Sequence, residues 1–207
     1  MKKTFILAIS LIIPAIFTVT AQDADKSKWK DMEIDFPKPM FVGTPVAAKL
    51  PNLDKSKKPR LVLKAPAGSE NLALDMEVTS SDPEPIIGDL DMICDGDKDG
   101  ADGSYTELGP GKQWVQVDLE EEATIYGIVV WHFHKNARAY IDVVAQVSND
   151  PEFKTGVITV FNNDHDNSSK AGAGKDLAWV ETNHGRIFDV EGKKARYVRL
   201  WSNGNTA

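Results

Sequence analysis

An acidic stretch of the sequence carries side chains that could bind a metal cation. Residues 95–104 read DGDKDGADGS, so carboxylates alternate with glycine and a hydroxyl follows. Calcium takes about six to eight oxygen ligands, and this pattern allows carboxylates and backbone carbonyls to curl around one point. The stretch begins like a helix–loop–helix calcium loop, but its twelfth residue is Thr106, where that motif needs Glu. We therefore expect either a calcium loop of another kind or a solvated acidic turn.

Hydrogen-bonding side chains follow the most apolar run of the domain. His132, His134, Arg138 and Tyr140 come after residues 125–131, which read IYGIVVW. An aromatic ring packs on the C–H face of a pyranose, while histidine and arginine can hydrogen-bond its hydroxyls. These residues therefore predict a carbohydrate-binding surface. The alternative is a satisfied histidine at a strand end and an arginine that pairs with surface carboxylates.

The most polar loop of the domain is a third candidate. Residues 162–169 read NNDHDNSS, and long polar loops on a rigid scaffold commonly carry binding residues. Asn163 and His165 are thus expected to contact sugar hydroxyls or a second ion, unless the loop is only a mobile surface segment. His132 and His134 could also chelate zinc or copper from one strand face, with a third ligand such as His165.

Signatures of catalysis are missing from the sequence. It contains no G-x-S-x-G elbow and no H-E-x-x-H zinc motif. Glu120, Glu121 and Glu122 are adjacent, whereas the carboxylates of a glycosidase converge across a cleft. The one cysteine, Cys94, follows apolar residues and is expected to be buried rather than nucleophilic. The chain is therefore predicted not to be an enzyme.

The first 21 residues have the pattern of a signal peptide. Lys2 and Lys3 precede an apolar core over residues 5–17, and the small-residue site Val-Thr-Ala ends at Ala21. We expect an exported protein that is secreted, periplasmic or associated with the cell envelope, and we consider membrane insertion unfavoured. The net charge of −7 becomes more negative when the two lysines are removed. This acidic balance argues against nucleic acid as a partner.

The remaining chain divides into a linker and one β-rich domain. Residues 22–64 are predicted to be a linker, because prolines recur there without a sustained apolar period. Over residues 65–207, short β-branched runs alternate with turn signals, which predicts an all-β antiparallel sandwich of the jelly-roll type. The expected strands are residues 72–74, 77–80, 114–119, 124–131, 140–148, 156–161, 178–181 and 197–201.

The stretch 113–134 is predicted to be the frame of this domain. Its first part alternates Val115, Val117 and Leu119 with polar or amphipathic residues, as a half-buried strand does. Its second part is almost continuously apolar, as in a strand that is covered on both faces. We expect two strands here, joined by a short acidic turn at residues 120–122.

Several segments resemble a discoidin domain, of the coagulation factor 5/8 type C family, in its order and spacing. They are residues 71–73 (NLA), 78–81 (VTSS), 94–97 (CDGD), 114–119 (WVQVDL), 146–150 (QVSND) with Phe153, and 195–200 (ARYVRL). The resemblance runs from about residue 71 to the end. It implies a galactose-binding-like jelly roll, which bacteria use mostly as a non-catalytic carbohydrate-binding module, often beside a structural calcium ion.

The resemblance also implies particular site residues. It places a calcium loop at residues 95–104, and an arginine and a histidine near strand ends commonly contact the sugar in related modules. His132 and Arg138 are the residues that match those sugar contacts. The candidate calcium ligands are Asp95, Asp97, Asp102 and Ser104.

The sequence departs from the family pattern at its end. Family members usually close with a further strand, which carries an acidic residue that helps to hold calcium, whereas this sequence stops at Ala207. We expect either a fragment or a domain that lacks its last strand, with an unpaired sheet edge.

The residues and the resemblance together predict an exported, non-catalytic carbohydrate-binding module. Its partner would be a carbohydrate or cell-surface glycan, held by a loop surface near a structural calcium. Three alternatives stay open: an adhesive protein–protein module of the cell envelope, the targeting module of a larger enzyme, and an anionic-lipid binder, which the negative charge disfavours.

Overall fold

A computed structural model describes residues 26–41, 50–56 and 61–206, and the predicted signal peptide, residues 1–21, lies outside them. The described residues contain strands and two short 3-10 helices but no α-helix. None of their helices has the length and apolarity that a membrane span requires. The elements are η1 (Lys26–Lys28), β1 (Lys30–Asp31), β2 (Lys64–Ala65), β3 (Val78–Ser80), η2 (Leu90–Ile93), β4 (Gln113–Val130), β5 (Val144–Ser148), β6 (Ile158–Asn162) and β7 (Arg186–Ser202).

The main sheet is antiparallel throughout and is built around two long strands. Its order is β3-β4-β7-β5-β6, so β4 and β7 lie at the centre. The predicted alternation over residues 114–119 is confirmed, because Val115 and Val117 belong to the hydrophobic core whereas Gln116 and Asp118 make polar contacts. The period-two pattern thus correctly identified which face of β4 is buried.

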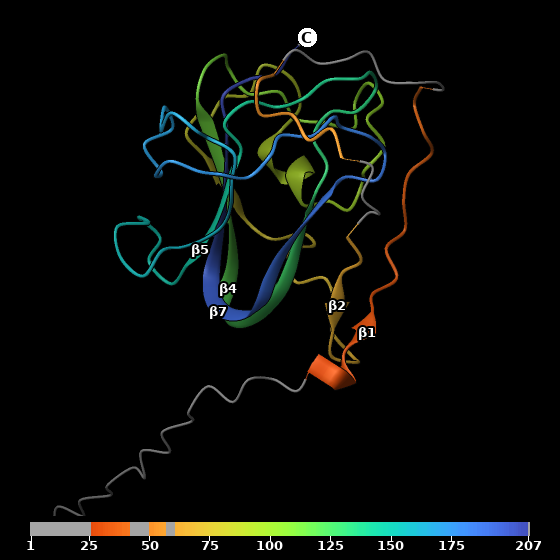
Figure 1. The fold of residues 1–207 in the computed structure, drawn as a ribbon, viewed down its shortest axis with the longest axis vertical. Coiled ribbons are helices and arrows are strands. Elements are labelled where there is room, and N and C mark those ends of the chain that lie inside the picture. The colour runs from red at the N-terminus through yellow and green to blue at the C-terminus, as the bar shows by residue number, and fades with distance from the viewer. Residues whose placement is uncertain (1–25, 42–49, 57–60, 207) are drawn as a thin grey trace, which may run out of the picture.

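The expected turn at residues 120–122 is wrong, and the chain bends there without leaving the sheet. β4 runs unbroken for 18 residues, and its register with β7 shifts between Asp118 and Ala123. Glu120 adopts a left-handed backbone conformation at φ 67°. A bulge of this kind bends a strand and keeps its partner, which a two-strand hairpin would not do. Figure 1 shows β4 and β7 bending together at the bottom of the view, so that their halves rise as two layers.

The two halves of the bent ribbon enclose the core and complete the predicted sandwich. One cluster joins Val117 and Val198 from one half with Ile125 and Val190 from the other. A second cluster contains Val143, Ala145, Phe161, Trp179 and Phe188. Residues from both halves therefore share one interior, which confirms the predicted all-β sandwich.

Two of the expected strands are not strands in the structure. Leu72 and Leu74 are exposed in a turn, and residues 178–181 form only a single bridge, between Ala178 and Leu53. Their apolar side chains are too few to define a face, so the local pattern could not distinguish a strand from an extended loop. The segment at 178–181 still contributes Trp179 to the core.

Cys94 is buried, as predicted, in the first core cluster. Burial, together with the smaller effects of the neighbouring Asp95 and Asp75 carboxylates, raises the pKa of its thiol to about 11. The thiol is therefore protonated at neutral pH and is a poor nucleophile.

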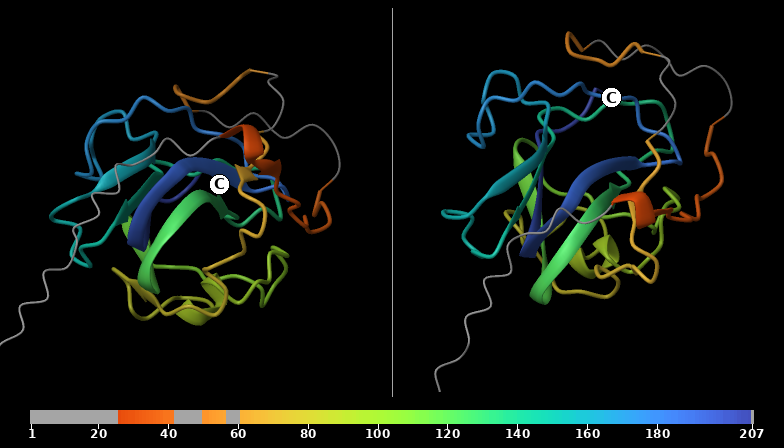
Figure 2. Two further views of the ribbon diagram at one scale, coloured as in Figure 1. Left: turned by 90° about the horizontal axis from the view of Figure 1, so that it is seen from below. Right: turned by 60° about the horizontal axis from the view of Figure 1, so that its bottom comes forward.

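The segment predicted as a linker lies against the domain in its described parts. β1 pairs with β2, and Trp29 packs edge-on against Tyr126 of β4 at a centroid distance of 5.2 Å. Further along, the Asn183 side chain donates a hydrogen bond to the carbonyl of Pro37 at 2.7 Å. Figure 2 shows this N-terminal segment running beside the bent ribbon.

Phe188 provides a test of the second core cluster. Phe188→Ala is expected to lower the free energy of unfolding by about 3–5 kcal/mol, because it leaves a cavity among Phe161, Trp179 and Val143. Ile158→Ala, at a more exposed position in β6, should lower it by less than about 1 kcal/mol. Denaturation in guanidinium chloride measures both, and equal losses would contradict this assignment of the core.

Candidate functional site

His132 lies just beyond the end of β4 and is held by a buried carboxylate. Its Nδ1 is 2.6 Å from Oε1 of Glu181, whose side chain is fully buried, while the His132 side chain is 16% exposed. The imidazole stacks on Tyr140 with ring centroids 4.2 Å apart and an angle of 16°. With Nδ1 donating to Glu181, Nε2 is the ring atom left for another partner.

The Glu181 carboxylate is committed to positioning this histidine. Its Oε2 is buried and has no hydrogen-bond partner among the described residues. The Glu181 backbone amide donates to the carbonyl of Arg138 at 2.8 Å. A buried carboxyl group needs a hydrogen-bonded partner, and His132 supplies it. Glu181 thus links two of the predicted ligand residues.

Arg138 and Tyr140 lie in the same cluster as His132. The Arg138 guanidinium is 4.5 Å from the centroid of the Phe133 ring, and its Nε donates to Oδ1 of Asn136 at 2.8 Å. Burial raises the pKa of the Tyr140 hydroxyl to about 12 against the opposing effect of Arg138, so the hydroxyl stays neutral. The cluster combines a half-buried cation, an imidazole and aromatic rings, which is the chemistry that sugar recognition uses.

His134 lies beneath the surface and not beside His132. Its side chain is only 1% exposed, and Nε2 is 2.8 Å from the carbonyl oxygen of Lys98 in the acidic loop. The ring faces Gly100 so closely that a Cβ there would lie 3.3 Å from Cε1. His134 therefore ties the acidic loop to the domain. No histidine belongs to a group of three close metal-ligand candidates within the described residues, so the zinc alternative gains no support.

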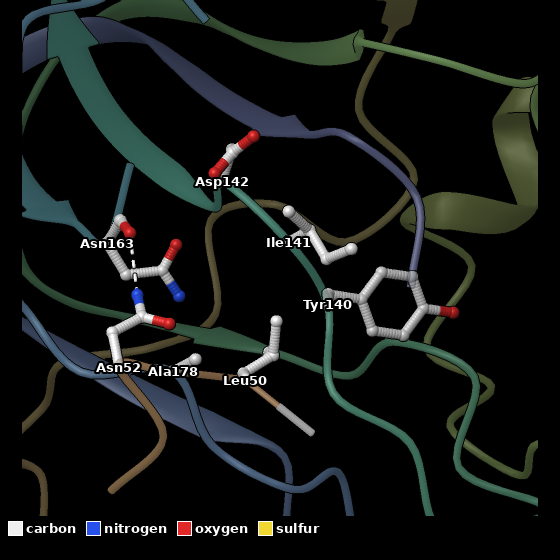
Figure 3. A pocket seen from close by; sticks show the side chains of 7 residues that line it. All are labelled: Leu50, Asn52, Tyr140, Ile141, Asp142, Asn163 and Ala178. Carbon is white, nitrogen blue, oxygen red and sulfur yellow. Dashed lines mark hydrogen bonds between the residues drawn. The ribbon is translucent and has the colours of Figure 1, made fainter. Parts of the chain in front are cut away.

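Asn163 and His165 occupy different environments in the polar loop. Asn163 is buried, and its Oδ1 accepts the amide of Val143 at 2.7 Å while its carbonyl accepts Nδ2 of Asn52 at 3.0 Å. Its own Nδ2 has no partner among the described residues. Figure 3 shows this amide beside a cavity of about 20 Å³ that is also lined by Tyr140 and Asp142, and that is large enough for one water. His165 is exposed, with Nε2 3.0 Å from the carbonyl of Asp176.

The acidic loop uses its carboxylates mainly to hold its own backbone. The Asp95 and Asp97 side chains accept the amides of Asp97 and Asp99, at 2.8 and 2.9 Å. The Asp99 amide and the Ser104 hydroxyl hold the pKa of Asp97 below its usual value. Asp102 is paired with Lys135 at 2.8 Å. Among the described residues, the side chains of these predicted ligands do not form a group of three carboxylates that lie close to one another.

Three other carboxylates do come together. One oxygen each from Asp142, Asp164 and Asp166 lies within 4.8 Å of the other two, so this cluster could hold a metal ion. Ser168 bridges it, because its hydroxyl donates to Asp142 at 2.7 Å and to Asp164 at 3.4 Å. The loop that supplies two of them was recognised from its polarity as a place for an ion. Asp142 was missed, because it is 22 residues distant from Asp164 in the sequence.

Asp164 is the buried member of this cluster and is strongly hydrogen-bonded. Burial raises the pKa of its carboxyl, but the hydroxyl and amide of Ser169 and the amide of Ser168 more than offset this, so the pKa lies below the usual value. The carboxylate therefore stabilises the fold above the usual pKa of an Asp side chain, and this stabilisation is lost as the pH falls through the lowered pKa.

Asp164→Asn tests that role. Measured with chelator present, the variant is expected to lose about 1–3 kcal/mol of unfolding free energy at pH 7, because an anionic acceptor becomes neutral. The difference from the wild type should narrow between about pH 5 and pH 2, as the wild-type carboxylate becomes protonated. Asp91→Asn, at an exposed position whose carboxylate makes no hydrogen bond or ion pair among the described residues, serves as the control. A difference that stays constant with pH would contradict the assignment.

Comparison with known proteins gives one family match. A family model described as "NedA-like, galactose-binding domain", of the F5/8 type C group, matches residues 92–200, which is more than half of the chain. The search of curated proteins finds no significant match. The matched segment contains the His132 cluster and both acidic groups.

Solved structures also show similarity, at low identity. A chitosan-binding module from Paenibacillus sp. IK-5 is 21% identical, with 66% of this chain and 88% of that chain covered and a TM-score of 0.44. A fucose-binding module from Streptococcus pneumoniae is 14% identical, with 66% and 91% covered and a TM-score of 0.43. The family match depends on the sequence model and not on these structural likenesses.

Proposed function

The chain belongs to the F5/8 type C family of galactose-binding-like domains, and on this basis we propose that it is an exported, non-catalytic module that binds carbohydrate. The observation that carries the proposal is the His132 cluster. A buried carboxylate fixes the imidazole through Nδ1, and Nε2 makes no hydrogen bond within the described part of the chain. A fixed imidazole atom beside Tyr140 is a suitable partner for a sugar hydroxyl.

Arg138 would supply the second polar contact to the sugar. Its Nε is engaged by Asn136 and its side chain also bonds to the Tyr140 hydroxyl, and the donors that are left can form charge-assisted bonds to sugar hydroxyls. The stacking on Phe133 restricts the guanidinium, so that less side-chain entropy is lost on binding. Phe133 and Tyr140 would pack against the apolar face of the ring. His165 and Asn163 stay secondary candidates, since Asn163 is reached only through the small cavity.

Export and a surface glycan as partner are part of the same proposal. Both depend on the signal-peptide pattern of residues 1–21 and on the acidic composition, which suits a neutral or cationic partner better than an anionic membrane. The ligand class is a cell-surface or extracellular polysaccharide, and the reaction chemistry of an enzyme is not required of any residue in the cluster.

We further propose that calcium stabilises the loops beside this surface. Asp142, Asp164 and Asp166 fit a hard cation in ligand type and in mutual distance, and Asp142 is two residues from Tyr140. The loop implied by the family, with Asp95, Asp97, Asp102 and Ser104, is the second candidate location, although Asp102 is already paired with Lys135. The ion would hold the loops and would not touch the sugar.

Substitutions in the cluster test the saccharide site. After a glycan array has identified a bound sugar, His132→Ala and Arg138→Ala should each weaken its binding by about tenfold or more in calorimetry, because each removes a directed hydrogen bond. His184→Ala removes an exposed histidine outside the cluster and should bind as the wild type does. An array without any bound glycan would instead favour the adhesive, protein-binding alternative.

The location of calcium is tested by thermal unfolding. Calcium should raise the unfolding temperature of the wild type and of Asp97→Asn, and it should have a smaller effect on Asp164→Asn, because bound ligand stabilises only a fold that holds it. The reverse order would move the ion to the acidic loop. No calcium-dependent shift in any of the three proteins would refute the calcium proposal while leaving the saccharide site untouched.

A further inference from the structure

A groove of about 330 Å³ lies on the outer face of the five-stranded sheet, away from the His132 cluster. Gln146 of β5 and Arg199 of β7 are paired across the sheet and line it, together with Trp201. Their strand neighbours Val147 and Val198 point into the core instead. Phe153, from the turn after β5, and Lys170, from the polar loop, form its sides. The volume is in the range of small-molecule binding sites, which begins at about 300 Å³.

Arg199 is a buried cation without a carboxylate partner. Its side chain is 8% exposed, and its Nε and Nη2 both donate to Oε1 of Gln116, at 2.9 and 2.5 Å. Nη2 also donates to the carbonyl of Pro151 at 3.0 Å. The guanidinium lies 4.3 Å from the Trp114 ring centroid and 4.1 Å from that of Phe153. All of these partners are neutral, and Nη1 makes no hydrogen bond within the part of the chain that is described.

Two lysines add positive charge at the groove. Lys170 lines it, is exposed, and forms no ion pair among the described residues. Lys112 lies next to it, with its ammonium 2.9 Å from the carbonyl of Ser169 and 5.4 Å from the Trp201 ring centroid. The chain as a whole has a net charge of −7, so these cations differ in sign from its overall charge.

No carboxylate lines the groove to neutralise these cations. Asp150 and Glu152, in the adjacent turn, are the acidic groups that act on Arg199. The Asp150 carboxylate is occupied by the backbone amides of Glu152, Lys154 and Thr155, and Glu152 is paired with Lys154 at 3.4 Å. A buried cation whose hydrogen-bond partners are all neutral favours an anionic ligand.

Aromatic and neutral polar groups in the groove match a sugar ring. The Trp201 indole is half-buried, and its Nε1 donates to Oε1 of Gln146 at 3.1 Å, which fixes its orientation. The Gln146 Nε2 donates in turn to the Thr159 hydroxyl at 3.2 Å. A fixed indole is a suitable stacking surface for a pyranose, and amide and hydroxyl groups can bond its hydroxyls.

We propose that this groove is a second ligand site, which binds a saccharide that carries an anionic group, either a carboxylate or a sulfate. The anionic group pairs with Arg199 Nη1 and Lys170, and the sugar ring packs against Trp201. The groove shares no residue with the His132 cluster, so this proposal can be tested independently of the function proposed for that cluster.

Calorimetry with three matched probes tests the groove. Trigalacturonate, sulfated galactotriose and neutral galactotriose are titrated into the full chain carrying His132→Ala, with chelator present, so that neither the His132 cluster nor a bridging metal contributes to the measured binding. We expect at least one anionic probe to bind about tenfold more tightly than galactotriose, and the stronger of the two identifies the anionic group. The indole Nε1–H signal of Trp201 should shift in NMR spectra during that titration, with Trp201→Phe used to assign it.

Variants separate the groove from general charge attraction. Lys170→Glu and Ala171→Trp, the latter filling the groove from its edge, should each weaken binding of the anionic probe by about tenfold or more. Lys175→Glu changes an exposed lysine of the same loop that does not line the groove, and it should leave binding of the anionic probe unchanged. The proposal is overturned if neither anionic probe binds, if galactotriose binds equally well, or if Lys175→Glu weakens binding as much as Lys170→Glu does.

Discussion

The continuous pairing of β4 with β7 is the constraint on which the rest of the structure depends. Thirteen residue pairs join these strands, from Gln113 with Ser202 to Val130 with Arg186, although the ribbon bends between two layers. Because the hydrogen bonds of a bulged ribbon continue on both sides of the bend, the two layers stay joined although the register shifts between Asp118 and Ala123 and again between Ile125 and Gly127. The ends of both strands then lie at the same end of the sandwich (Figure 1), where the connecting loops gather.

This arrangement explains how distant residues form the His132 cluster. His132 follows Val130, the last paired residue of β4, and Glu181 lies in the segment before β7, 49 residues later in the chain. Arg138 is fixed in turn by the Glu181 amide. A rigid two-layer scaffold with side chains projecting from adjoining loops is a common basis for ligand binding. The outer face of the sheet is a separate surface, where Arg199 lies among neutral partners.

The sequence could predict those features that depend on local pattern. The alternation around Val115 and Val117 correctly predicted a buried face, and the position of His132 after an apolar strand correctly placed it at a strand end. The pairing with Glu181 could not be predicted, because it depends on which loops the fold brings together. Nor could the burial of His134, since it depends on the packing of the acidic loop, through Lys98 and Gly100, against its ring. At Glu120, a run of acidic residues indicated a turn where tertiary pairing with β7 instead maintained a bulged strand.

For the metal ligands of the polar loops, prediction from the sequence has the same limit: it does not show which residues the fold brings together. The alternating carboxylates after Cys94 predicted a cation loop from composition alone, yet two of them cap backbone amides and a third is paired with Lys135. Asp142 and Asp164 meet because the loop after β6 folds back beside the segment before β5, which no local spacing encodes. Donor type is visible in a sequence, whereas convergence of donors is a property of the fold.

Because Cys94 is buried, the reactivity of its thiol can be used to measure how often the folded domain opens. It is the only thiol of the protein, and it packs against the same cluster as Val117 and Val190 from the two layers. With a raised pKa, the thiol reacts slowly even where reagent reaches it, so rapid modification requires separation of the layers. The rate of thiol labelling in native buffer would therefore follow the frequency with which the sandwich opens, independently of any ligand or spectroscopic probe.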